Sequence, residues 1–397
     1  MSEGTEKTPR KGIVLQFPSK TQGKAMSFSK LEPWDDDVIG SELAEEIAAT
    51  IRQYVVLTES ATVAITLWVI LTYCFEQFTI TPILAIVSPE KQCGKTTLLD
   101  VLHGLVCKPL LTSSITAASV FRVIEKERPT LLIDEADSFI KNDEALRGVL
   151  NSGNRASGSV LRTVGDNHEV CAFSTYSPKA IALIGSLPDT LQDRSVCIQL
   201  RRRSKNERVS RFLSNKVDAL NITARKAAYW ADSFGHELKS AEPTIPSFLN
   251  NRTADNWLPL LAIADLIGDG WGQRARDAAK LITAKTSGDV VSVRTLLLAD
   301  IKEIFDNAKV DRLRSDAIAN LLNNLDERPW AEWKRGQPLS TYQLAYLLRS
   351  FSICSSTIRV NSTAKPAKGY VRSQFEEAWA HYLTDETTAL QNNEAAS

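Results

Sequence analysis

The chain has 397 residues, a hydrophobic content of 43%, a charged content of 24% and a formal net charge of +0. This length allows two or three domains with a sizeable core, and the composition is that of a globular protein. Zero net charge excludes a global basic field for nucleic acid, so such binding requires local patches. The six cysteines and four histidines are scattered, which favours reduced thiols in a cytosol and excludes a zinc pattern.

Residues 1–30 are polar and basic, so we expect a disordered tail and no signal peptide. The basic residues of this tail either contact nucleic acid or, as the default, stay solvated. Residues 31–79 are predicted to be an N-terminal helical segment with two helices between residues 39 and 78. The apolar stretch 61–75 is too short to span a bilayer and indicates a buried helix, so we expect a cytoplasmic protein with no membrane partner.

A phosphate-binding loop is predicted near the start of residues 80–203. The apolar run 83–87 indicates a buried parallel strand, Gly94-Lys95-Thr96 follows a polar loop, and leucines then recur at helical spacing. Strand, loop, Gly-Lys-Thr and helix is the order that a P-loop requires, with backbone N–H groups facing phosphates. The expected nucleotide-binding residues are Pro89, Glu90, Lys91, Gln92, Cys93, Gly94, Lys95, Thr96 and Thr97.

Two side chains of this loop carry the expected chemistry. Lys95 is expected to reach the β and γ phosphates and Thr96 to bind Mg²⁺, so ATP and Mg²⁺ are the expected cofactors. Two positions depart from the full motif: Pro89 replaces the first glycine and removes an N–H group, and Gln92 stands where many such loops have a second glycine. A chance Gly-Lys-Thr before a helix is the alternative.

A second apolar strand ends in Asp134 and Glu135, which is the pattern of a Walker B motif. Asp134 is expected to hold Mg²⁺ through its water shell, and Glu135 to orient or deprotonate the attacking water. Solvated acids at a strand end are the alternative, which is less common for two carboxylates one βαβ unit after a P-loop. The pair predicts nucleotide hydrolysis, with Glu135 and Lys95 as catalytic residues.

The alternation of strands and helices continues to residue 203 and predicts an α/β fold, a P-loop NTPase core with a parallel sheet and helices on both faces. The predicted strands are 83–87, 110–112, 130–134, 180–185 and 196–200, and the predicted helices are 96–106, 117–126 and 143–150. One segment, 157–173, breaks the alternation and is predicted to be a hairpin around Gly165.

This core resembles that of AAA+ ATPases. In ring-shaped AAA+ helicases a hairpin at this place projects into the pore and touches DNA, so Arg155, Arg162 and His168 are candidate phosphate contacts. A hairpin that extends the sheet, with Arg162 on its solvent face, is the alternative. The resemblance also makes Arg194 an arginine finger for the γ-phosphate of a neighbouring subunit, and places Ser186 near a polar sensor.

An arginine finger implies a homo-oligomer, with a hexameric ring as one arrangement. The alternative for Arg194 is a surface ion pair with Asp189 or Asp193. The adjacent arginines at 201–203 are either a phosphate clamp or, as the preferred interpretation, a solvated exit from the last strand. Residues 204–290 are predicted to be a helical lid, in which Arg252 either faces the nucleotide as a sensor or pairs with Asp255.

Residues 291–383 resemble a winged helix-turn-helix. A helix is predicted from a cap at Ser340 or Thr341, and residues 365–371 are predicted to form a hairpin. The candidate groove contacts are Ser355, Ser356, Thr357 and Arg359, and the candidate backbone-phosphate contacts are Lys365, Lys368 and Arg372. A protein-docking or purely structural unit is the alternative. The polar residues 384–397 are expected to be a disordered tail.

From Leu31 to about Leu383, the chain resembles the domain-of-unknown-function family 3631. The strings that carry the resemblance are SPEKQCGKTT at 88–97, RPTLLIDEAD at 128–137, LNSGN at 150–154, LPDT at 187–190 with the Asp-Arg pair at 193–194, and RTADNW at 252–257. The family resembles P-loop helicase-like ATPases of phages, plasmids and integrated elements. Members are often joined to primase-type domains, and we predict no such domain from this sequence.

Three functions follow as expectations. The first is a DNA-acting ATPase, a helicase or replication-associated motor of a phage, plasmid or integrated element, with single-stranded DNA at the hairpin and duplex DNA at the winged helix. The second is an ATP-driven oligomeric regulatory or anti-phage defence ATPase that recruits a replication or defence partner protein without unwinding DNA. The third is a nucleotide-binding scaffold with weak turnover.

Overall fold

The computed structural model describes residue 28 and residues 31–32, 34–140, 142–204, 206–213, 218–288, 293–326, 328–334, 336–359 and 365–383. The chain forms two compact units, divided between Ile282 and Thr283. Apart from Phe28, the tails predicted at 1–30 and 384–397 lie outside the described residues, as does the predicted boundary at 290–291.

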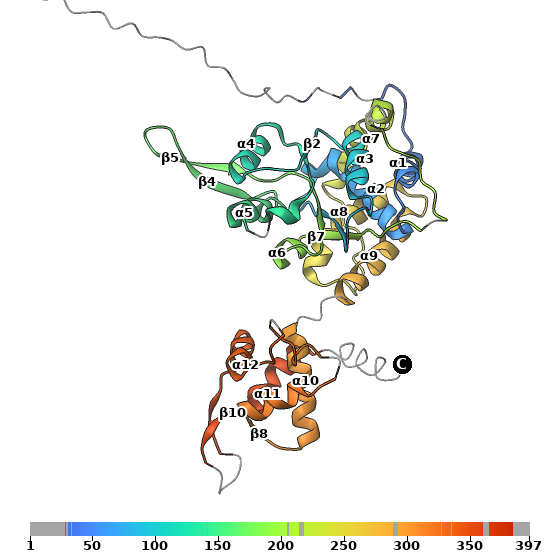
Figure 1. Ribbon diagram of the computed structural model, residues 1–397. Helices are drawn as coiled ribbons and strands as arrows, with labels where there is room; N and C mark the ends of the chain where they lie inside the picture. The colour runs from blue at the N-terminus through green and yellow to red at the C-terminus, as the bar shows by residue number, and fades with distance from the viewer. Residues whose placement is uncertain are drawn as a thin grey trace, which may run out of the picture. The chain divides into compact units, whose positions relative to one another are not determined.

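A five-stranded parallel sheet in the order β2-β3-β6-β1-β7 forms the centre of the larger unit (Figure 1). Its strands are β1 (Ile83–Ser88), β2 (Pro109–Thr112), β3 (Thr130–Ile133), β6 (Lys179–Ile184) and β7 (Ser195–Gln199). Strands buried on both faces read as continuous apolar runs, which explains why the sequence predicts them. The α/β class with a parallel sheet is confirmed.

Helices cover both faces of this sheet, as Figure 1 shows. The helices of the unit are α1 (Gly40–Tyr54), α2 (Glu59–Cys74), α3 (Lys95–Leu105), α4 (Ala117–Glu127), α5 (Glu144–Ser152), α6 (Asp189–Gln192), α7 (Asn221–Leu238), α8 (Asn251–Ile267) and α9 (Trp271–Gly288). Side chains alternate along β1, so Leu84 and Ile86 pack with α1, α2, α3, α7 and α8, and Ile83 and Ala85 pack with α4 and α5. The predicted N-terminal helices and lid helices therefore share one apolar cluster.

Helix α2 is buried along almost its whole length. With its 3-10 extension it is long and apolar enough, by length and composition, to cross a membrane. Its side chains instead contact α1, α7 and α8, and the indole of Trp68 donates a hydrogen bond to the carbonyl of Pro82 at 3.0 Å. The helix begins where the Ala61 N–H donates to the hydroxyl of Thr58 at 3.2 Å. This placement is that of a core helix, as the sequence predicts.

Strands β4 (Ser159–Val164) and β5 (Glu169–Ser174) form a separate two-stranded antiparallel sheet. They do not extend the central sheet, and Figure 1 shows the hairpin projecting away from it. At its base, the Phe173 ring lies 5.0 Å from the Phe121 ring of α4. At the start of β6, the Nζ of Lys179 holds the returning chain because it lies within hydrogen-bond distance of the carbonyls of Gly153 (2.8 Å), Thr175 (3.1 Å) and Ser177 (2.6 Å).

The smaller unit contains α10 (Val293–Ala308), β8 (Arg312–Arg314), α11 (Ser315–Asn323), α12 (Thr341–Leu348), β9 (Ser356–Ile358), β10 (Ala367–Val371) and α13 (Glu376–Tyr382). Its three strands form an antiparallel sheet in the order β8-β10-β9. The predicted cap of α12 is present as a capping box, because the N–H groups of Ser340 and Gln343 bond to each other's side chains. The aromatic core includes Trp330, Tyr370 and Phe375.

Residues 355–359, which contain the predicted groove contacts, include the strand β9. The strand β9 within them pairs with β10, so that Ser356 faces Gly369 and Thr357 faces Lys368. A Cβ atom at Gly369 would collide with the Ile358 side chain and the Leu313 carbonyl, so only glycine permits this close approach of three strands. The β-branched residues of β9, Thr357 and Ile358, face Lys368 and Ala367 of β10 and suit a strand.

Candidate functional site

The loop that joins β1 to α3 wraps the N-terminus of α3 at the carboxyl edge of the central sheet. Gly94 is the N-cap residue with φ of +88°, a conformation that favours glycine. No side chain among the described residues caps α3, so its first N–H groups are available to a ligand. A helix N-terminus with free N–H groups and a positive dipole end is suited to bind an anion.

Gln92 adopts φ of +66°, the left-handed conformation that a glycine would adopt without strain. The departure from the motif at this position therefore leaves the turn itself in place. The cost is about 1 kcal/mol of backbone strain for a residue with a Cβ atom.

Lys95 folds back over this loop. Its Nζ donates to the hydroxyl of Ser88 at 2.5 Å and to the carbonyl of Glu90 at 3.3 Å. Both acceptors are neutral, and none of the ion pairs among the described residues involves Lys95. Its charge is therefore available to an anion at the N-terminus of α3.

Thr96 and Asp134 meet although 38 residues separate them in sequence. The Thr96 hydroxyl donates to Asp134 Oδ2 at 2.9 Å, and the Glu135 N–H donates to Asp134 Oδ1 at 2.9 Å. A hydroxyl and a carboxylate are the hard oxygen donors that Mg²⁺ prefers. The described residues contain no group of three or more His, Cys, Asp or Glu side chains placed for a metal. These two donors fit Mg²⁺, which usually keeps several waters and phosphate oxygens as its other ligands.

Glu135 lies exposed at the same edge, with a left-handed backbone at φ of +52°. The next acid along the chain, Asp137, accepts a hydrogen bond from the Ile184 N–H at 3.2 Å and so ties this turn to the end of β6. Ser186 is exposed just past β6, which runs between β1 and β3. The sheet order therefore places Ser186 between the Lys95 loop and Asp134.

Asp100 joins this site, and the sequence analysis missed it. It lies on α3 one turn after Thr96, a spacing of i, i+4 that would have pointed to it. Partial burial raises the pKa of the Asp100 carboxyl, and the negative charge of Asp134 raises it further. The site thus gathers more negative charge than the motif alone provides, which favours a cation.

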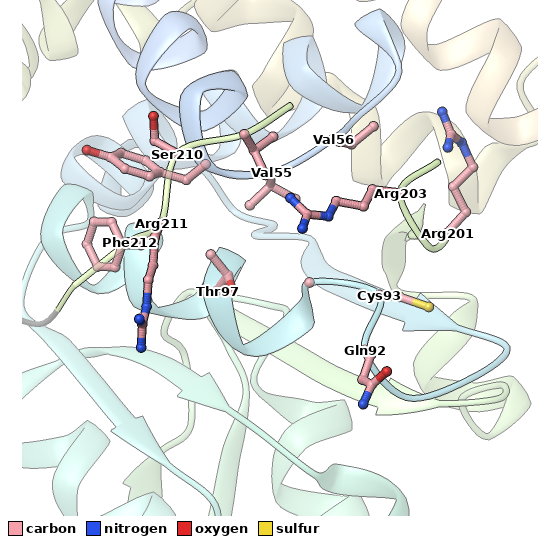
Figure 2. A pocket seen from close by; sticks show the side chains of 13 residues that line it. Val55, Val56, Gln92, Cys93, Thr97, Arg201, Arg203, Ser210, Arg211 and Phe212 are labelled. Carbon is pink, nitrogen blue, oxygen red and sulfur yellow. The ribbon is translucent and has the colours of Figure 1, made fainter. Parts of the chain in front are cut away.

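A cavity of about 620 Å³ opens beside Gly94 and Thr97 (Figure 2). It is lined by the segment before α2, by the 89–94 loop and by the segment that follows β7. The lining residues are Tyr54, Val55, Val56, Gln92, Cys93, Gly94, Thr97, Arg201, Arg203, Val209, Ser210, Arg211 and Phe212. A cavity of this size that adjoins an anion-binding helix terminus is large enough for a nucleoside.

Arg194 lies at the opposite edge of the sheet. Its carbonyl accepts the N–H of Ile83, the first residue of β1, at 2.9 Å. The length of β1 therefore separates Arg194 from the 89–94 loop of its own chain by roughly 17 Å. Its guanidinium donates to the Thr190 carbonyl at 2.6 Å, and the pKa of Arg194 is lowered by burial and by the nearby charges of Arg252 and Arg155.

Arg252 also lies at this amino edge, not at the Lys95 loop of its own chain. Its guanidinium pairs with Asp193 Oδ2 at 2.5 Å, and the Asn256 side chain donates to the Asp193 carbonyl at 2.9 Å. The expected alternative partner, Asp255, pairs instead with Arg155 at 3.5 Å. Because α8 begins beside β7, its first turn carries Arg252 to the amino edge. Arg155, Arg194 and Arg252 thus form an arginine cluster there.

The three residues proposed for DNA contact near the hairpin do not form one surface. Arg155 belongs to the arginine cluster, Arg162 lies 5.2 Å over the Phe121 ring, and His168 is exposed in the hairpin turn. The hairpin instead exposes three apolar side chains that the sequence analysis did not single out, Leu161 (63%), Val164 (46%) and Val170 (65%). By the strand register, Leu161 and Val170 share one face of the hairpin and Val164 lies on the other.

In the smaller unit, Ser355, Ser356, Thr357 and Arg359 lie on or beside β9, and Lys365 and Lys368 precede or lie on β10. Arg372 is engaged internally, by an ion pair with Asp306 at 2.5 Å and by the Trp379 ring at 5.2 Å. The residues that the sequence analysis missed are Tyr342 (80% exposed) and Tyr346 (63% exposed) on α12. Their i, i+4 spacing puts both on the face of α12 opposite the buried Leu344 and Leu348.

Comparisons with known proteins identify one family and several similar proteins. Residues 199–382 match the family described as "Protein of unknown function (DUF3631)". An "uncharacterized 28.9 kDa protein in xis 5'region" of Saccharopolyspora erythraea is 35% identical over 190 residues, which cover 47% of this chain and 69% of that protein. Two apo structures of the C-terminal region of NrS-1 are similar in part, and each similarity covers 86% of this chain. The first has 13% sequence identity and a TM-score of 0.43, and 78% of that chain is covered. The second has 12% sequence identity and a TM-score of 0.38, and 77% of that chain is covered. The chain belongs to the DUF3631 family of proteins of unknown function.

Proposed function

We propose that the chain is an ATP-hydrolysing P-loop protein of the AAA+ type. The observation that carries the proposal is the hydrogen bond between Thr96 and Asp134, which joins the two sequence motifs at one edge of the sheet beside the uncompensated Lys95. A strand-end carboxylate, a hydroxyl and a lysine at a helix N-terminus are the groups that phosphoryl transfer requires.

Each residue of the proposed nucleotide site has a separate role. Lys95 exchanges Ser88 and the Glu90 carbonyl for phosphate oxygens, and the free N–H groups of α3 bind the same phosphates. Thr96 and Asp134 hold Mg²⁺, which neutralises phosphate charge when bound. Glu135, exposed at the same edge, orients the attacking water and accepts its proton.

Arg194 acts on a second copy of the chain. Within one chain it lies roughly 17 Å from the 89–94 loop, at the other end of β1, so it is too far to contact the same γ-phosphate. A homo-oligomer in which the amino edge of one copy faces the carboxyl edge of the next brings the arginine cluster to that phosphate. A closed ring is one such arrangement.

The test is ATP turnover by the purified chain with and without Mg²⁺. We expect Lys95→Ala and Glu135→Gln each to lower turnover by about 100-fold or more. Glu135→Gln should keep nucleotide binding, because the carboxylate acts on water and not on the phosphates. Lys126→Ala, on the exposed side of α4, is the control and should retain full turnover. Wild-type turnover in both site variants would disprove the proposal.

The proposed target is DNA, in a cytoplasmic helicase or replication-associated motor of a mobile element. The relative named for a xis 5′ region supports the mobile-element setting. The order of helices and strands in the smaller unit supports a winged helix, in which α12, with Tyr342 and Tyr346, enters the groove and Lys365 and Lys368 flank it. Stimulation of ATP turnover by DNA that is lost in Tyr342→Ala/Tyr346→Ala supports this role.

A second function is favoured by the hairpin. Leu161, Val164 and Val170 are apolar and exposed, which suits a protein partner better than DNA phosphates. In that case the protein is an ATP-driven regulatory or defence ATPase that recruits another protein. ATP turnover that is indifferent to DNA, with no strand separation, would favour this second function.

A further inference from the structure

We propose that Arg203 and Arg211 bind the phosphates nearest the nucleoside, from the same chain that supplies Lys95. The two arginines lie on a strap, defined as the described residues 201–204 and 206–213, which follows β7 and leads towards α7. This inference rests on the proposed nucleotide site and assigns it a second set of cationic groups.

The strap is fixed across the mouth of the cavity at two places. At one end Arg202 pairs with Glu90 at 2.7 Å and donates to the Lys91 carbonyl at 3.3 Å. At the other end the Ser210 N–H donates to the Gln53 carbonyl at 2.8 Å. The Phe212 ring packs edge-on against the Tyr54 ring, with centroids 4.9 Å apart. The strap therefore joins the 89–94 loop to the last turn of α1.

The arginines of the strap fall into two groups. Arg201 makes two hydrogen bonds to Glu207, and Arg202 is held by Glu90, so both charges are compensated. Arg203 and Arg211 make no ion pair with any residue in the described ranges, and both line the cavity. Figure 2 shows the Arg203 side chain directed towards Val55, whereas the Arg211 side chain extends in a different direction and Arg201 is directed away from both.

Two arginines with no ion pair among the described residues, and Gly94 at the N-terminus of α3, thus line one cavity. The positive charge of each arginine and the positive end of the helix dipole favour an anion. Arginine is the side chain best suited to phosphate because its planar fork donates two parallel hydrogen bonds. A nucleoside polyphosphate is the class of ligand that supplies phosphate anions to these groups.

The side chains of the first turn of α3 indicate how that ligand is oriented in the site. Successive helical residues point about 100° apart. Thr96 points to Asp134, whereas Thr97 lines the cavity with Gly94 and Arg203. The terminal phosphate therefore lies towards Asp134 and Glu135, and the nucleoside lies in the cavity. Arg203 and Arg211 then contact phosphates that ATP and ADP have in common.

The test measures the affinity of ADP and ATP by isothermal titration in Arg203→Ala, Arg211→Ala and the double variant. Arg208→Ala, on the same strap but not at the cavity, is the control. We expect each single change at the cavity to weaken ADP and ATP alike by about 10-fold, since each removes a charge-assisted hydrogen bond to a shared phosphate. Arg203→Lys should recover part of the loss.

Three outcomes decide against the inference. Unchanged ADP affinity in the double variant, a loss confined to ATP, or an equal loss in Arg208→Ala would each overturn it. Circular dichroism of every variant separates a binding effect from misfolding. If the wild-type chain binds neither nucleotide, the proposed function itself fails, whereas normal wild-type binding with unaffected arginine variants refutes the strap alone.

Discussion

The charged residues at the two edges of the central sheet differ in the partners that they contact. At the carboxyl edge, Lys95 has only neutral partners and Asp134 is already joined to Thr96. At the amino edge, Arg252 and Arg155 are paired with acids, and the charges of both act on Arg194. The carboxyl edge is suited to bind a ligand, and the amino edge is suited to contact another protein surface. Because β1 holds them apart, a single chain contains both halves of the proposed catalytic site but does not unite them.

The largest expected effect comes from removing the amino-edge arginine finger. Arg194→Ala should lower ATP turnover about 1000-fold while ADP affinity stays unchanged, because the lost guanidinium serves the phosphate of another copy. Mixing Arg194→Ala with Lys95→Ala should restore part of the turnover, since intact Lys95 and intact Arg194 then meet across one interface. The measurement is ATP turnover of the mixed oligomer.

The control for that mixing experiment is the double variant Lys95→Ala/Arg194→Ala, which has no arginine to contribute. It should restore nothing when mixed with Arg194→Ala. Turnover that stays at the wild-type level in Arg194→Ala alone would mean that the two edges do not cooperate.

A smaller effect is expected at Arg252. Arg252→Ala breaks an exposed ion pair with Asp193, so the free energy of unfolding should fall by less than about 1 kcal/mol. ATP turnover should fall by about 10-fold because Asp193 and Arg194 lose a neighbour that orders them. ADP affinity, measured by titration, should not change. An ADP affinity that falls as far as in Arg203→Ala would place Arg252 at the nucleotide and contradict its position at the amino edge.

The amino edge also contains a group that responds to pH. Burial lowers the pKa of Lys179 to about 7. Between pH 7 and the ordinary value of 10.5 the unfolded chain keeps a proton that the folded chain has released, so unfolding takes up a proton and stability rises with pH. Relative to Lys179→Met, the wild-type chain should gain at least about 1 kcal/mol from pH 7 to 9. Urea unfolding of both chains checks this, and parallel pH profiles would contradict it.

A further effect on stability is expected in the carboxyl-edge loop. Gln92→Val puts a β-branched residue at φ of +66° and should destabilise the chain by about 1–2 kcal/mol, with weaker ADP binding. Gln92→Gly adopts the same conformation without strain and should bind ADP as the wild-type chain does. Equal stability of the two variants in thermal unfolding would show that this turn is not held in place.

The sequence predicts the parts of the fold that depend on local pattern. The five strands were predictable because each is a short apolar run. Four site residues were also predictable because they lie directly at strand or helix ends, namely Lys95, Thr96, Asp134 and Glu135. In a parallel sheet such ends share one edge, so their meeting follows from the order of elements. The capping box of α12 is local as well, and its cap was predicted at Ser340 or Thr341.

Residues whose position depends on distant packing were not predictable. Arg252 pairs with Asp193 across 59 residues, and only the path of α8 decides which edge it reaches. Arg203 and Arg211 belong to a segment without regular structure, where no periodicity shows which side chains face the cavity. Residues 356–358 form a strand by pairing with β10, in which Gly369 permits the close approach and which comes later in the chain.

The burial of α2 has a consequence for the biogenesis of the protein. The helix is completed at Cys74, but α7 and α8, which cover it, end only at Leu238 and Ile267. At about 5–20 residues per second, a ribosome needs roughly ten to forty seconds to supply them. During that interval a nascent chain displays an apolar helix that resembles a membrane segment. We expect this protein to depend on a holdase chaperone at the ribosome, and fragments that end before α8 to aggregate.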